Sequence, residues 1–175
     1  MKLKDNINTP PVHGTSASSS RVRYMKKNIA ALLEAKGMNV SNVRSGQVIC
    51  VTFPADIFFS PNDTELSLQG AEALKNLEQI AGLPQLYRIV VAVHADDSGD
   101  DVYTEKLTRQ RADAIKTELE RMARKSSVNP NIDYYWMGNS ENLVPNNSVV
   151  NRAKNRRIEF YIVPEKQAVE ASRSS

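Results

Sequence analysis

The sequence predicts an α/β domain (an α+β sandwich) in which helices pack on a small mixed sheet. Two segments rich in β-branched and apolar residues, 48–53 and 87–93, are typical of buried strands. Each is followed by a segment whose apolar residues recur at helical spacing, 66–81 and 103–125. Strands that alternate with helices along a chain form a sheet with helices packed on it, so this order predicts the fold class.

The N-terminal part of the chain is expected to hold a tail and one additional helix. Residues 1–20 are rich in Pro, Gly and Ser, a composition typical of flexible tails. Apolar residues return at helical spacing over 21–36, with Ser20 in the N-cap position and Gly37 at the end. We therefore expect a flexible tail over 1–20 and a helix with its connector over 21–47.

The rest of the sheet is predicted from short apolar segments. Pro54 interrupts the first strand, and residues 57–59 either extend that strand or form a short second piece. Two further strands are expected at 133–137 and 157–163, on either side of a loop rich in Gly, Asn, Pro and Ser. The predicted order from residue 48 is therefore strand, helix, strand, helix, strand, strand.

Composition and charge argue against several classes of protein. The 175 residues carry a formal net charge of +3 with both signs interspersed, which disfavours nucleic-acid binding as the main function. The one cysteine, Cys50, cannot form an intramolecular disulfide or a multi-cysteine zinc site. Two histidines are too few for a histidine-based metal site. No cofactor and no metal ion are therefore expected.

The sequence predicts no membrane-spanning helix. The longest apolar runs, such as 89–93, are far shorter than the roughly 20 residues that span a bilayer. The basic start at 1–4 is followed by polar residues rather than by the apolar segment of a signal peptide. Two interpretations stay open: the protein remains in the cytoplasm, or a leader has been removed.

A candidate functional carboxylate follows the second predicted strand. Asp96 lies in the loop directly after 87–93. In open α/β sheets, ligands bind beyond the carboxyl ends of the strands, so Asp96 is well placed to contact one. The alternative is that Asp96 and Asp97 are turn residues that cap the helix at 103–125.

Arg111 lies on or beside the apolar stripe of the helix at 103–125. It is four residues from both Leu107 and Ile115, so it faces a similar side of the helix, near its start. Burying an unpaired charge is expensive, which predicts a carboxylate partner, and Asp96 is within reach. The pair is either a structural salt bridge or a clamp for one zwitterionic ligand, with Arg111 on its carboxylate and Asp96 on its ammonium group.

A basic segment precedes the last predicted strand. Residues 152–157 carry four positive charges over six positions. Such charge either forms a solvated approach to an edge strand, where it discourages aggregation, or binds nucleic acid. A nucleic-acid surface would interleave aromatic side chains, and only Phe160 and Tyr161 are near. We therefore expect no nucleic-acid partner.

Several motifs are more specific together than any one of them is alone. In chain order they are HADDSG at 94–99, YTEKLTRQRA at 103–112, Gly138, Glu141, Pro145 and NRRIE at 155–159. Over about residues 48–164, the chain resembles the C-terminal peptidoglycan-binding domain of the OmpA family, which Pal lipoproteins and flagellar stator proteins share. Upstream, a predicted helix with Tyr24 in its first turn precedes the strand at 48–53. This arrangement resembles that of the lipoprotein-anchored members of the family. A polar tail is expected over 165–175.

The resemblance implies a β-α-β-α-β-β domain that is not an enzyme and that grips peptidoglycan non-covalently. In the family, the ligand is the free end of diaminopimelate in the stem peptide. The resemblance implies that Asp96 takes its ammonium group and Arg111 its carboxylate. The other implied ligand-binding positions are Thr104 and the backbone N–H groups of Phe59 and Ser60. The positions implied to support the site are Tyr103, Asn155, Arg156 and Arg157.

The chain departs from the family pattern close to the expected site. Ala95 replaces a threonine and loses its hydroxyl, and Thr104 replaces an asparagine and loses the amide pair. Ser60 stands where aspartate is common, and Pro61, which follows it, has no N–H to donate. These departures alter the affinity or the preferred ligand, or they mark a purely structural member of the family.

Two other classes of function are weighed beside peptidoglycan binding. An enzyme would use His94, Asp96 and Asp97 as metal ligands or acid–base groups. One histidine with two aspartates offers few such groups, and no activated nucleophile is evident beside them. Cys50 lies within a predicted strand, which favours inert packing over reactivity. The second class is an assembly module, in which the helix at 21–36 pairs with another copy or with an envelope partner.

The resemblance also implies a location. We expect the domain at the periplasmic face of the bacterial outer membrane or elsewhere in the cell envelope. Membrane association is expected only through an anchor that is not visible in this sequence.

Overall fold

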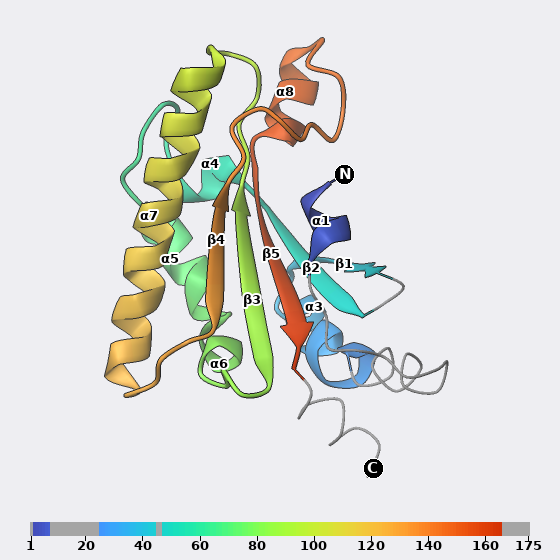
Figure 1. Ribbon diagram of the computed structural model, residues 1–175, viewed down its shortest axis with the longest axis vertical. Coiled ribbons are helices and arrows are strands. Elements are labelled where there is room, and N and C mark those ends of the chain that lie inside the picture. Colours follow the sequence, from blue (N-terminus) through green and yellow to red (C-terminus); the bar gives the residue numbers. More distant parts are fainter. Residues whose placement is uncertain (1, 8–24, 45–46, 166–175) are drawn as a thin grey trace.

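A five-stranded mixed sheet forms the centre of the computed structural model, which describes residues 2–7, 25–44 and 47–165 (Figure 1). The strands are β1 (Asn39–Val43), β2 (Val48–Pro54), β3 (Tyr87–Val93), β4 (Ile132–Trp136) and β5 (Arg157–Pro164). Their order across the sheet is β1-β2-β5-β3-β4. The pair β3–β4 is parallel and the other pairs are antiparallel. The mixed sheet confirms the predicted fold class.

Helices cover the sheet mainly on one face (Figure 1). They are η1 (Met25–Ala30, a π-helical turn), α3 (Ala31–Ala35), α4 (Ala55–Phe58), α5 (Leu68–Lys75), α6 (Glu78–Ala81) and α7 (Asp101–Lys125). A short helix, α1 (Leu3–Asn6), lies against the opposite face, and α8 (Val149–Asn155) precedes β5. None of the described helices is long and apolar enough to cross a membrane.

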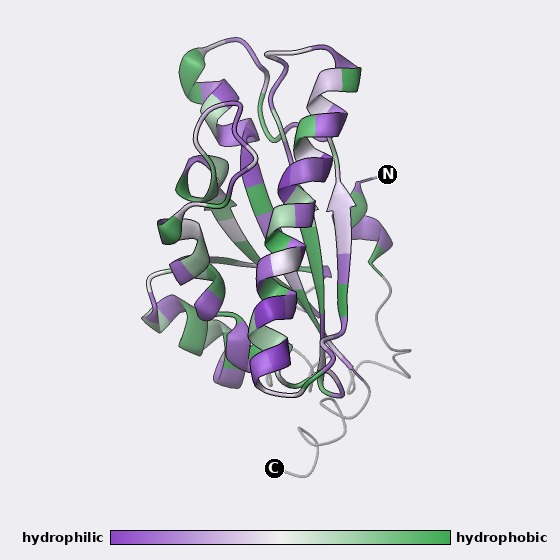
Figure 2. Cartoon of the chain, turned by 90° about the vertical axis from the view of Figure 1, so that its left-hand side faces the viewer, coloured by the Kyte–Doolittle hydropathy of each residue, from purple (hydrophilic) through white to green (hydrophobic). Residues whose placement is uncertain are grey.

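The alternation of side chains along the strands divides the core in two. On β5, Ile158, Phe160 and Ile162 face the helices and join the larger core, whereas Tyr161 and Val163 face the other side. Both sets are buried because β5 is the central strand. Figure 2 shows the polar outer face of α7 in front of the largely hydrophobic strands. This helix therefore packs one amphipathic side on the sheet.

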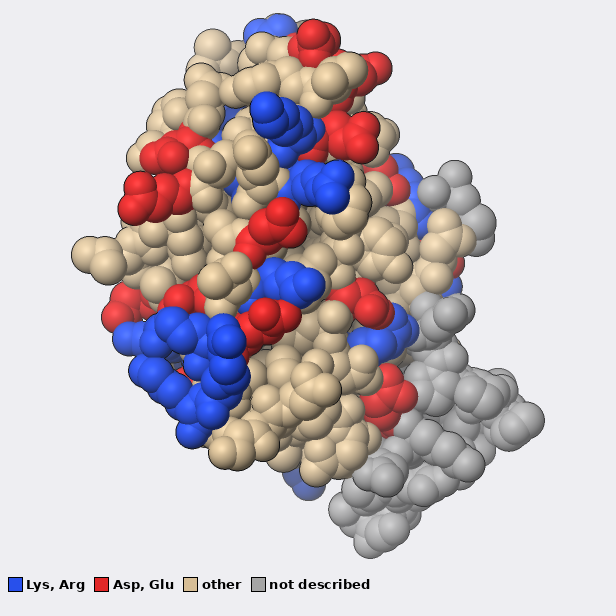
Figure 3. All heavy atoms as spheres, turned by 60° about the vertical axis from the view of Figure 1, so that its left-hand side comes forward, with Lys and Arg blue, Asp and Glu red and all other residues tan. Residues whose placement is uncertain are grey.

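The face that carries α7 has mixed charge. Figure 3 shows Lys and Arg side chains interspersed with Asp and Glu over this face, with one group of basic side chains at its lower end. Near that end, Arg121 forms two hydrogen bonds with Glu118, at 2.6 and 2.9 Å. Interspersed charge of this kind is typical of a solvated helix face.

The structure differs from the sequence prediction in several elements. Residues 57–59 do not continue the first strand, because α4 begins directly after Pro54 and Phe59 follows it in an extended conformation. The helix predicted over 66–81 is interrupted between α5 and α6. The edge strand β1 and the short helices α1, α4 and α8 were not predicted.

The predicted N-terminal elements are described only in part. Of the tail at 1–20, residues 2–7 are described; they include α1, and Ile7 is buried in the smaller core. Of the helix at 21–36, residues 21–24 lie outside the described residues, and the rest forms η1 and α3. Of the C-terminal tail, only Glu165 is described.

Candidate functional site

A cavity of about 280 Å³ opens beyond the carboxyl end of β3. It is enclosed by the loop at 95–99, by the first turns of α7, by the segment at 61–62 and by Asp56 and Arg156. A larger cavity of about 410 Å³ lies beside the C-terminal half of α7, and none of the predicted site residues lines it. The chemistry predicted from the sequence therefore belongs to the smaller cavity.

Arg111 reaches this cavity from the buried side of α7. Its side chain is only 4% exposed, and its guanidinium lies 5.0 Å from the centre of the Phe59 ring. Nε donates to the carbonyl of Asp63 at 2.8 Å, and Nη2 donates to the carbonyl of Ser60 at 3.1 Å. No carboxylate lies within ion-pair distance of the guanidinium among the described residues. Burial lowers the pKa of Arg111, yet an arginine stays charged.

Asp96 enters the same cavity from the loop after β3. It is 5% exposed, and its Oδ1 accepts a hydrogen bond from the backbone N–H of Ser98 at 2.9 Å. Its Oδ2 accepts from Nη1 of Arg156 at 2.6 Å. Burial alone would raise the pKa of Asp96, but the hydrogen bonds from Ser98 and the charge of Arg156 hold the pKa below its ordinary value.

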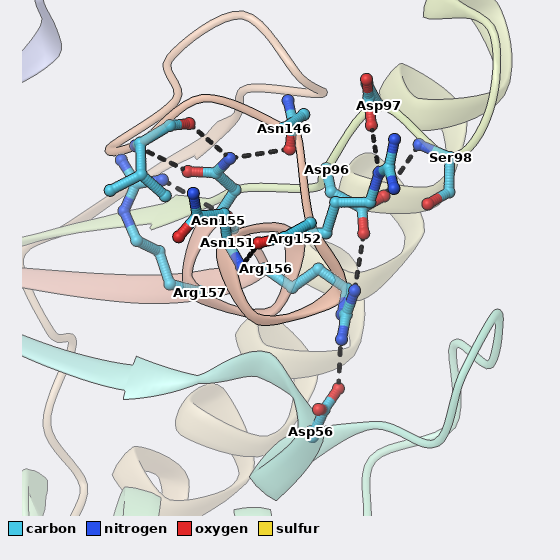
Figure 4. Close-up of polar contacts among 12 residues, drawn as sticks. Asp56, Asp96, Asp97, Ser98, Asn146, Asn151, Arg152, Asn155, Arg156 and Arg157 are labelled. Atoms are coloured by element: carbon cyan, nitrogen blue, oxygen red, sulfur yellow. Dashed lines mark hydrogen bonds and ion pairs between the residues drawn. The ribbon is translucent and has the colours of Figure 1, made fainter.

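Two expectations for Asp96 are corrected by this geometry. A direct salt bridge between Asp96 and Arg111 is absent from the described residues, because Arg156 takes that place beside Asp96 (Figure 4). Asp96 does not cap α7 either, since the side chain of Asp100 accepts from the N–H of Tyr103 at the start of that helix. Asp96 and Arg111 line one cavity without pairing.

The ion pair with Arg156 makes the stability that Asp96 contributes dependent on pH. Because its folded-state pKa is lowered, this contribution is present above the unfolded pKa of about 3.9 and is lost as the pH falls through the folded-state pKa. We expect Asp96→Asn to lower the free energy of unfolding by about 1–3 kcal/mol at pH 7. The difference from the unsubstituted chain is expected to disappear towards pH 2.

Urea unfolding at a series of pH values measures this difference. Asp97→Asn is the matched control, because Asp97 forms an exposed ion pair with Arg152 at 2.9 Å. Exposed pairs contribute about 0–1 kcal/mol, so the control is expected to change stability little at any pH. A loss in Asp96→Asn that is as large at pH 2 as at pH 7 would contradict the assigned ion pair.

The arginines of the basic segment are mostly paired with acidic side chains. Arg152 contacts Asp97, and Arg156 contacts Asp96 (Figure 4). Arg157 is buried, and its Nη2 lies 3.3 Å from Oε1 of Glu159. These contacts neutralise much of the positive charge of the segment, at the surface for Arg152 and in the interior for Arg157.

Asn155 organises the loop between β4 and α8. Its side chain is 0% exposed. Its Oδ1 accepts from the N–H groups of Leu143 and Val144, and its Nδ2 donates to the carbonyl of Val144 and to Oδ1 of Asn146. Asn155 therefore fixes the loop that precedes α8. Because it is the last residue of α8, it also fixes the backbone from which the side chain of Arg156 extends.

Tyr103 spans one side of the cavity. Its hydroxyl donates to Oδ1 of Asn62 at 2.8 Å and so links α7 to the segment at 61–62. Its ring lies against Gly99, where an added Cβ would stand 2.4 Å from the ring. Thr104 also lines the cavity, and its hydroxyl donates to the carbonyl of Asp101 within the first turn of α7.

Phe59 and Ser60 both contact Arg111, and the backbone N–H of Phe59 does not take the role that the resemblance implies. The N–H of Phe59 already donates to the carbonyl of Ala55 at 3.0 Å, so in this structure it is not free for a ligand. The ring of Phe59 lies under the guanidinium of Arg111. Ser60 supplies its carbonyl to Arg111. Both residues thus position Arg111.

His94 belongs to a separate buried cluster. Its Nε2 lies 2.5 Å from Oε1 of Glu159, whose Oε2 accepts from the hydroxyl of Tyr161 at 2.9 Å. Cys50 lies in the same cluster, and burial raises the pKa of its thiol to about 12, which agrees with an inert, packed side chain. Neither His94 nor Asp97 lines the cavity, so the acid–base site weighed from the sequence is not assembled there.

Two residues of the site were missed by sequence reasoning. Asp56 and Asn62 both line the cavity. Asp56 lies in α4, between the strand predicted at 48–53 and the short piece predicted at 57–59, so its direction could not be inferred. Asn62 adopts a positive φ of 57° in the turn after α4, a conformation that asparagine tolerates better than most residues. The turn composition at 60–63 was the available signal for it.

Comparisons with known proteins agree with the resemblance. The sequence model of the OmpA family matches residues 58–156. The chain is 31% identical over 114 residues to outer membrane protein A of Bordetella avium, covering 65% of this chain and 57% of that protein. It is 25% identical over 142 residues to the probable lipoprotein YiaD of Escherichia coli (strain K12), covering 81% of this chain and 64% of that protein. The chain thus spans about three fifths of these relatives.

Solved structures show the same fold. The cell wall anchor of the T6SS from Pseudomonas aeruginosa has a TM-score of 0.60 at 19% identity, covering 82% of this chain and 96% of that chain. The periplasmic domain of Helicobacter pylori MotB has 0.59 at 20% identity, covering 79% and 88%. The peptidoglycan-associated lipoprotein of Burkholderia pseudomallei has 0.52 at 19% identity, covering 61% and 87%.

These findings confirm two expectations drawn from the sequence. The relatives are named as outer-membrane proteins or lipoproteins, so the placement in the bacterial cell envelope is confirmed at that level. The match to the family model extends over more than half of the chain and includes both Asp96 and Arg111. The chain belongs to the OmpA family.

Proposed function

We propose that this domain binds peptidoglycan non-covalently by holding the free end of diaminopimelate in the stem peptide. One observation carries the proposal. Arg111 is a buried guanidinium on the wall of a cavity, and among the described residues only backbone carbonyls accept its hydrogen bonds. A buried charge without a counter-charge is costly, and a ligand carboxylate would supply one.

The geometry of Arg111 suits a carboxylate. Two of its nitrogens, Nε and Nη2, are anchored on the carbonyls of Asp63 and Ser60, which fixes the plane of the guanidinium. No hydrogen bond from Nη1 is formed within the described part of the chain. An arginine has five N–H donors in a fixed fork, so donors remain for a charge-assisted bond to the ligand.

Asp96 is the proposed partner of the ligand's ammonium group. An ionised carboxylate offers about four lone-pair sites, and two are used here, by Ser98 and by Arg156. Ala95, Leu107 and Pro61 add apolar surface to the same cavity. This surface suits the methylene groups that join the free end of diaminopimelate to its peptide-linked end. The cavity therefore combines the two charges with an apolar lining, as a small-molecule site does.

The proposed role is mechanical rather than catalytic. Each site would bind one stem peptide, and firm attachment to the wall would come from many copies acting together. A homodimer through the helix at 21–36 is not favoured, because two of its apolar side chains, Ile29 and Leu33, are buried in the domain's own core. We therefore propose attachment of an envelope component to the cell wall as the function.

Sedimentation with purified cell walls tests this proposal. The chain is expected to sediment with peptidoglycan that contains diaminopimelate and to be released by an excess of free meso-diaminopimelate. The same concentration of Nα-acetyl-lysine amide, which presents an ammonium group without a carboxylate, is expected to release little. A folded chain that stays in the supernatant with every wall preparation would contradict the proposal.

A further inference from the structure

Arg156 lies between two carboxylates at the cavity (Figure 4). Its Nη1 donates to Oδ2 of Asp96 at 2.6 Å, and its Nε lies 3.7 Å from Oδ1 of Asp56. The two acidic side chains differ in exposure, at 7% for Asp96 and 60% for Asp56. Arg156 thus has a close, buried partner and a looser, solvent-facing one.

A ligand ammonium group that reaches Asp96 meets Arg156 there. Both oxygens of Asp96 already accept hydrogen bonds, one of them from the guanidinium. Two cations on one buried carboxylate repel each other strongly, because little water screens them. Binding of the ammonium group is therefore easier if the charge of Arg156 is drawn elsewhere.

The backbone keeps Asp56 within reach of Arg156. The N–H of Ala55 donates to the carbonyl of Arg156 at 3.0 Å, and Pro54 pairs with Arg157 in the β2–β5 register. Because these contacts tie the start of α4 to the start of β5, a rotation of the Arg156 side chain alone could exchange Asp96 for Asp56. No rearrangement of the strands is needed.

The charges on the cavity wall also balance. Asp56 and Asp96 carry two negative charges, and Arg111 and Arg156 carry two positive ones. A wall of zero net charge suits a ligand end of zero net charge, which an ammonium and a carboxylate on one carbon provide. Without Asp56, the wall would carry one excess positive charge and would favour a ligand end that is purely anionic.

We propose that Asp56 is a specificity-determining residue of this site: it receives Arg156 when the ligand's ammonium group occupies Asp96, and so selects a zwitterionic ligand end over an anionic one. The inference rests on the proposed function, because it assumes that the zwitterion is the end of diaminopimelate. Asp56 is exposed and lies outside the pair Asp96 and Arg111 that holds the ligand. The inference gives Asp56 the role of discriminating between ligands that all carry a carboxylate.

Three synthetic stem tripeptides, L-Ala-γ-D-Glu-X, test the assignment by calorimetric titration of the whole chain. The third residue is meso-diaminopimelate, with ammonium and carboxylate; 2-aminopimelate, with carboxylate alone; or lysine, with ammonium alone. The unsubstituted chain is expected to bind the first more tightly than the second. In Asp56→Asn, this ratio of affinities is expected to fall about tenfold, because the first ligand is weakened and the second is not.

Asp97→Asn is the matched control, because Asp97 is also paired with an arginine nearby but does not line the cavity. It is expected to keep the ratio of the unsubstituted chain. Thermal unfolding of all three proteins ensures that the variants are compared as folded chains.

Each contrary outcome has a distinct meaning. An unchanged ratio in Asp56→Asn overturns the inference and leaves the proposed function standing. An equal loss for both carboxylate-bearing ligands also overturns it, since Asp56 would then only support the site. If the unsubstituted chain binds none of the three ligands, the proposed function fails and the inference fails with it.

Discussion

Replacing Arg111 with alanine is expected to abolish measurable binding of peptides that contain diaminopimelate. Truncating one partner of a buried, hydrogen-bonded charge pair costs about 2–5 kcal/mol of binding free energy, and about 2.7 kcal/mol already corresponds to a hundredfold loss. The structure places no other guanidinium of the described residues in the same position, since Arg156 is engaged by Asp96. Calorimetric titration with a muropeptide measures the loss.

The same substitution is also expected to lower stability moderately without unfolding the chain. Arg111 holds the segment after α4 through the carbonyls of Asp63 and Ser60. Without it, the carbonyl of Asp63 would lose this partner, whereas the carbonyl of Ser60 would keep the hydrogen bond from the N–H of Asp63 at 3.0 Å. Leaving a carbonyl unpaired costs about 1–3 kcal/mol when it stays dry, but removal of a buried charge offsets part of the cost. Asp96 keeps its partner, Arg156, so no buried carboxylate is left alone.

Arg109→Ala is the matched control for this prediction. Arg109 lies on the same helix, with its guanidinium 5.3 Å from the ring of Trp136, and it does not line the cavity. This variant is expected to bind like the unsubstituted chain. A folded Arg111→Ala protein, verified by circular dichroism, that still sediments with cell walls would contradict the role given to Arg111.

Replacing Asn155 with alanine is expected to give the largest loss of stability among single substitutions near the site. The side chain is buried and takes part in four hydrogen bonds with the loop before α8. Several partners would be left unpaired at once, which predicts a fall of about 2–4 kcal/mol in the free energy of unfolding. Urea unfolding measures this, and amide hydrogen exchange is expected to speed up first in the loop at 138–148.

Asn151→Ala offers a comparison on the same helix. Asn151 donates one side-chain hydrogen bond, to Oδ1 of Asn147, and is only half-buried. A single bond of this kind contributes about 0.5–1.5 kcal/mol, so this variant is expected to lose much less stability. Equal losses in the two variants would show that the loop does not depend on Asn155.

The fold was largely predictable because its strands and long helix carry strong local patterns. The apolar runs at 48–53 and 87–93 and the helical stripe at 103–125 each match a strand or helix of the structure. The edge strand β1 was missed because its side chains are mostly exposed, so it lacks the apolar signal of a buried strand. The helix α8 is short and exposes its two valines, so it lacks an apolar stripe facing the core, and its side-chain cap at Ser148 was hidden within a loop-like composition.

The site was predictable only where the spacing along one helix or the position directly after a strand decides the outcome. The spacing of Arg111 on its helix predicted a buried guanidinium, and the position of Asp96 after β3 predicted a carboxylate at the same end of the sheet. The direct salt bridge between them, which was one of the two predicted roles, is not formed because Asp96 pairs with Arg156. The contact of Asp96 with Arg156 depends on how β5 lies beside β3, which no local pattern contains. The direction of Asp56 depends on α4, a helical turn that was not predicted after Pro54.

Calorimetric titration of the folded, unsubstituted chain with a diaminopimelate-containing muropeptide, and with its lysine-containing analogue, tests the central claim most directly. The two ligands differ by one carboxylate, which is the group assigned to Arg111. Saturable binding of the first ligand, with the second weaker by about a hundredfold or more, is the predicted result. Equal affinity for both ligands, or no heat with either from a well-folded sample, would contradict it.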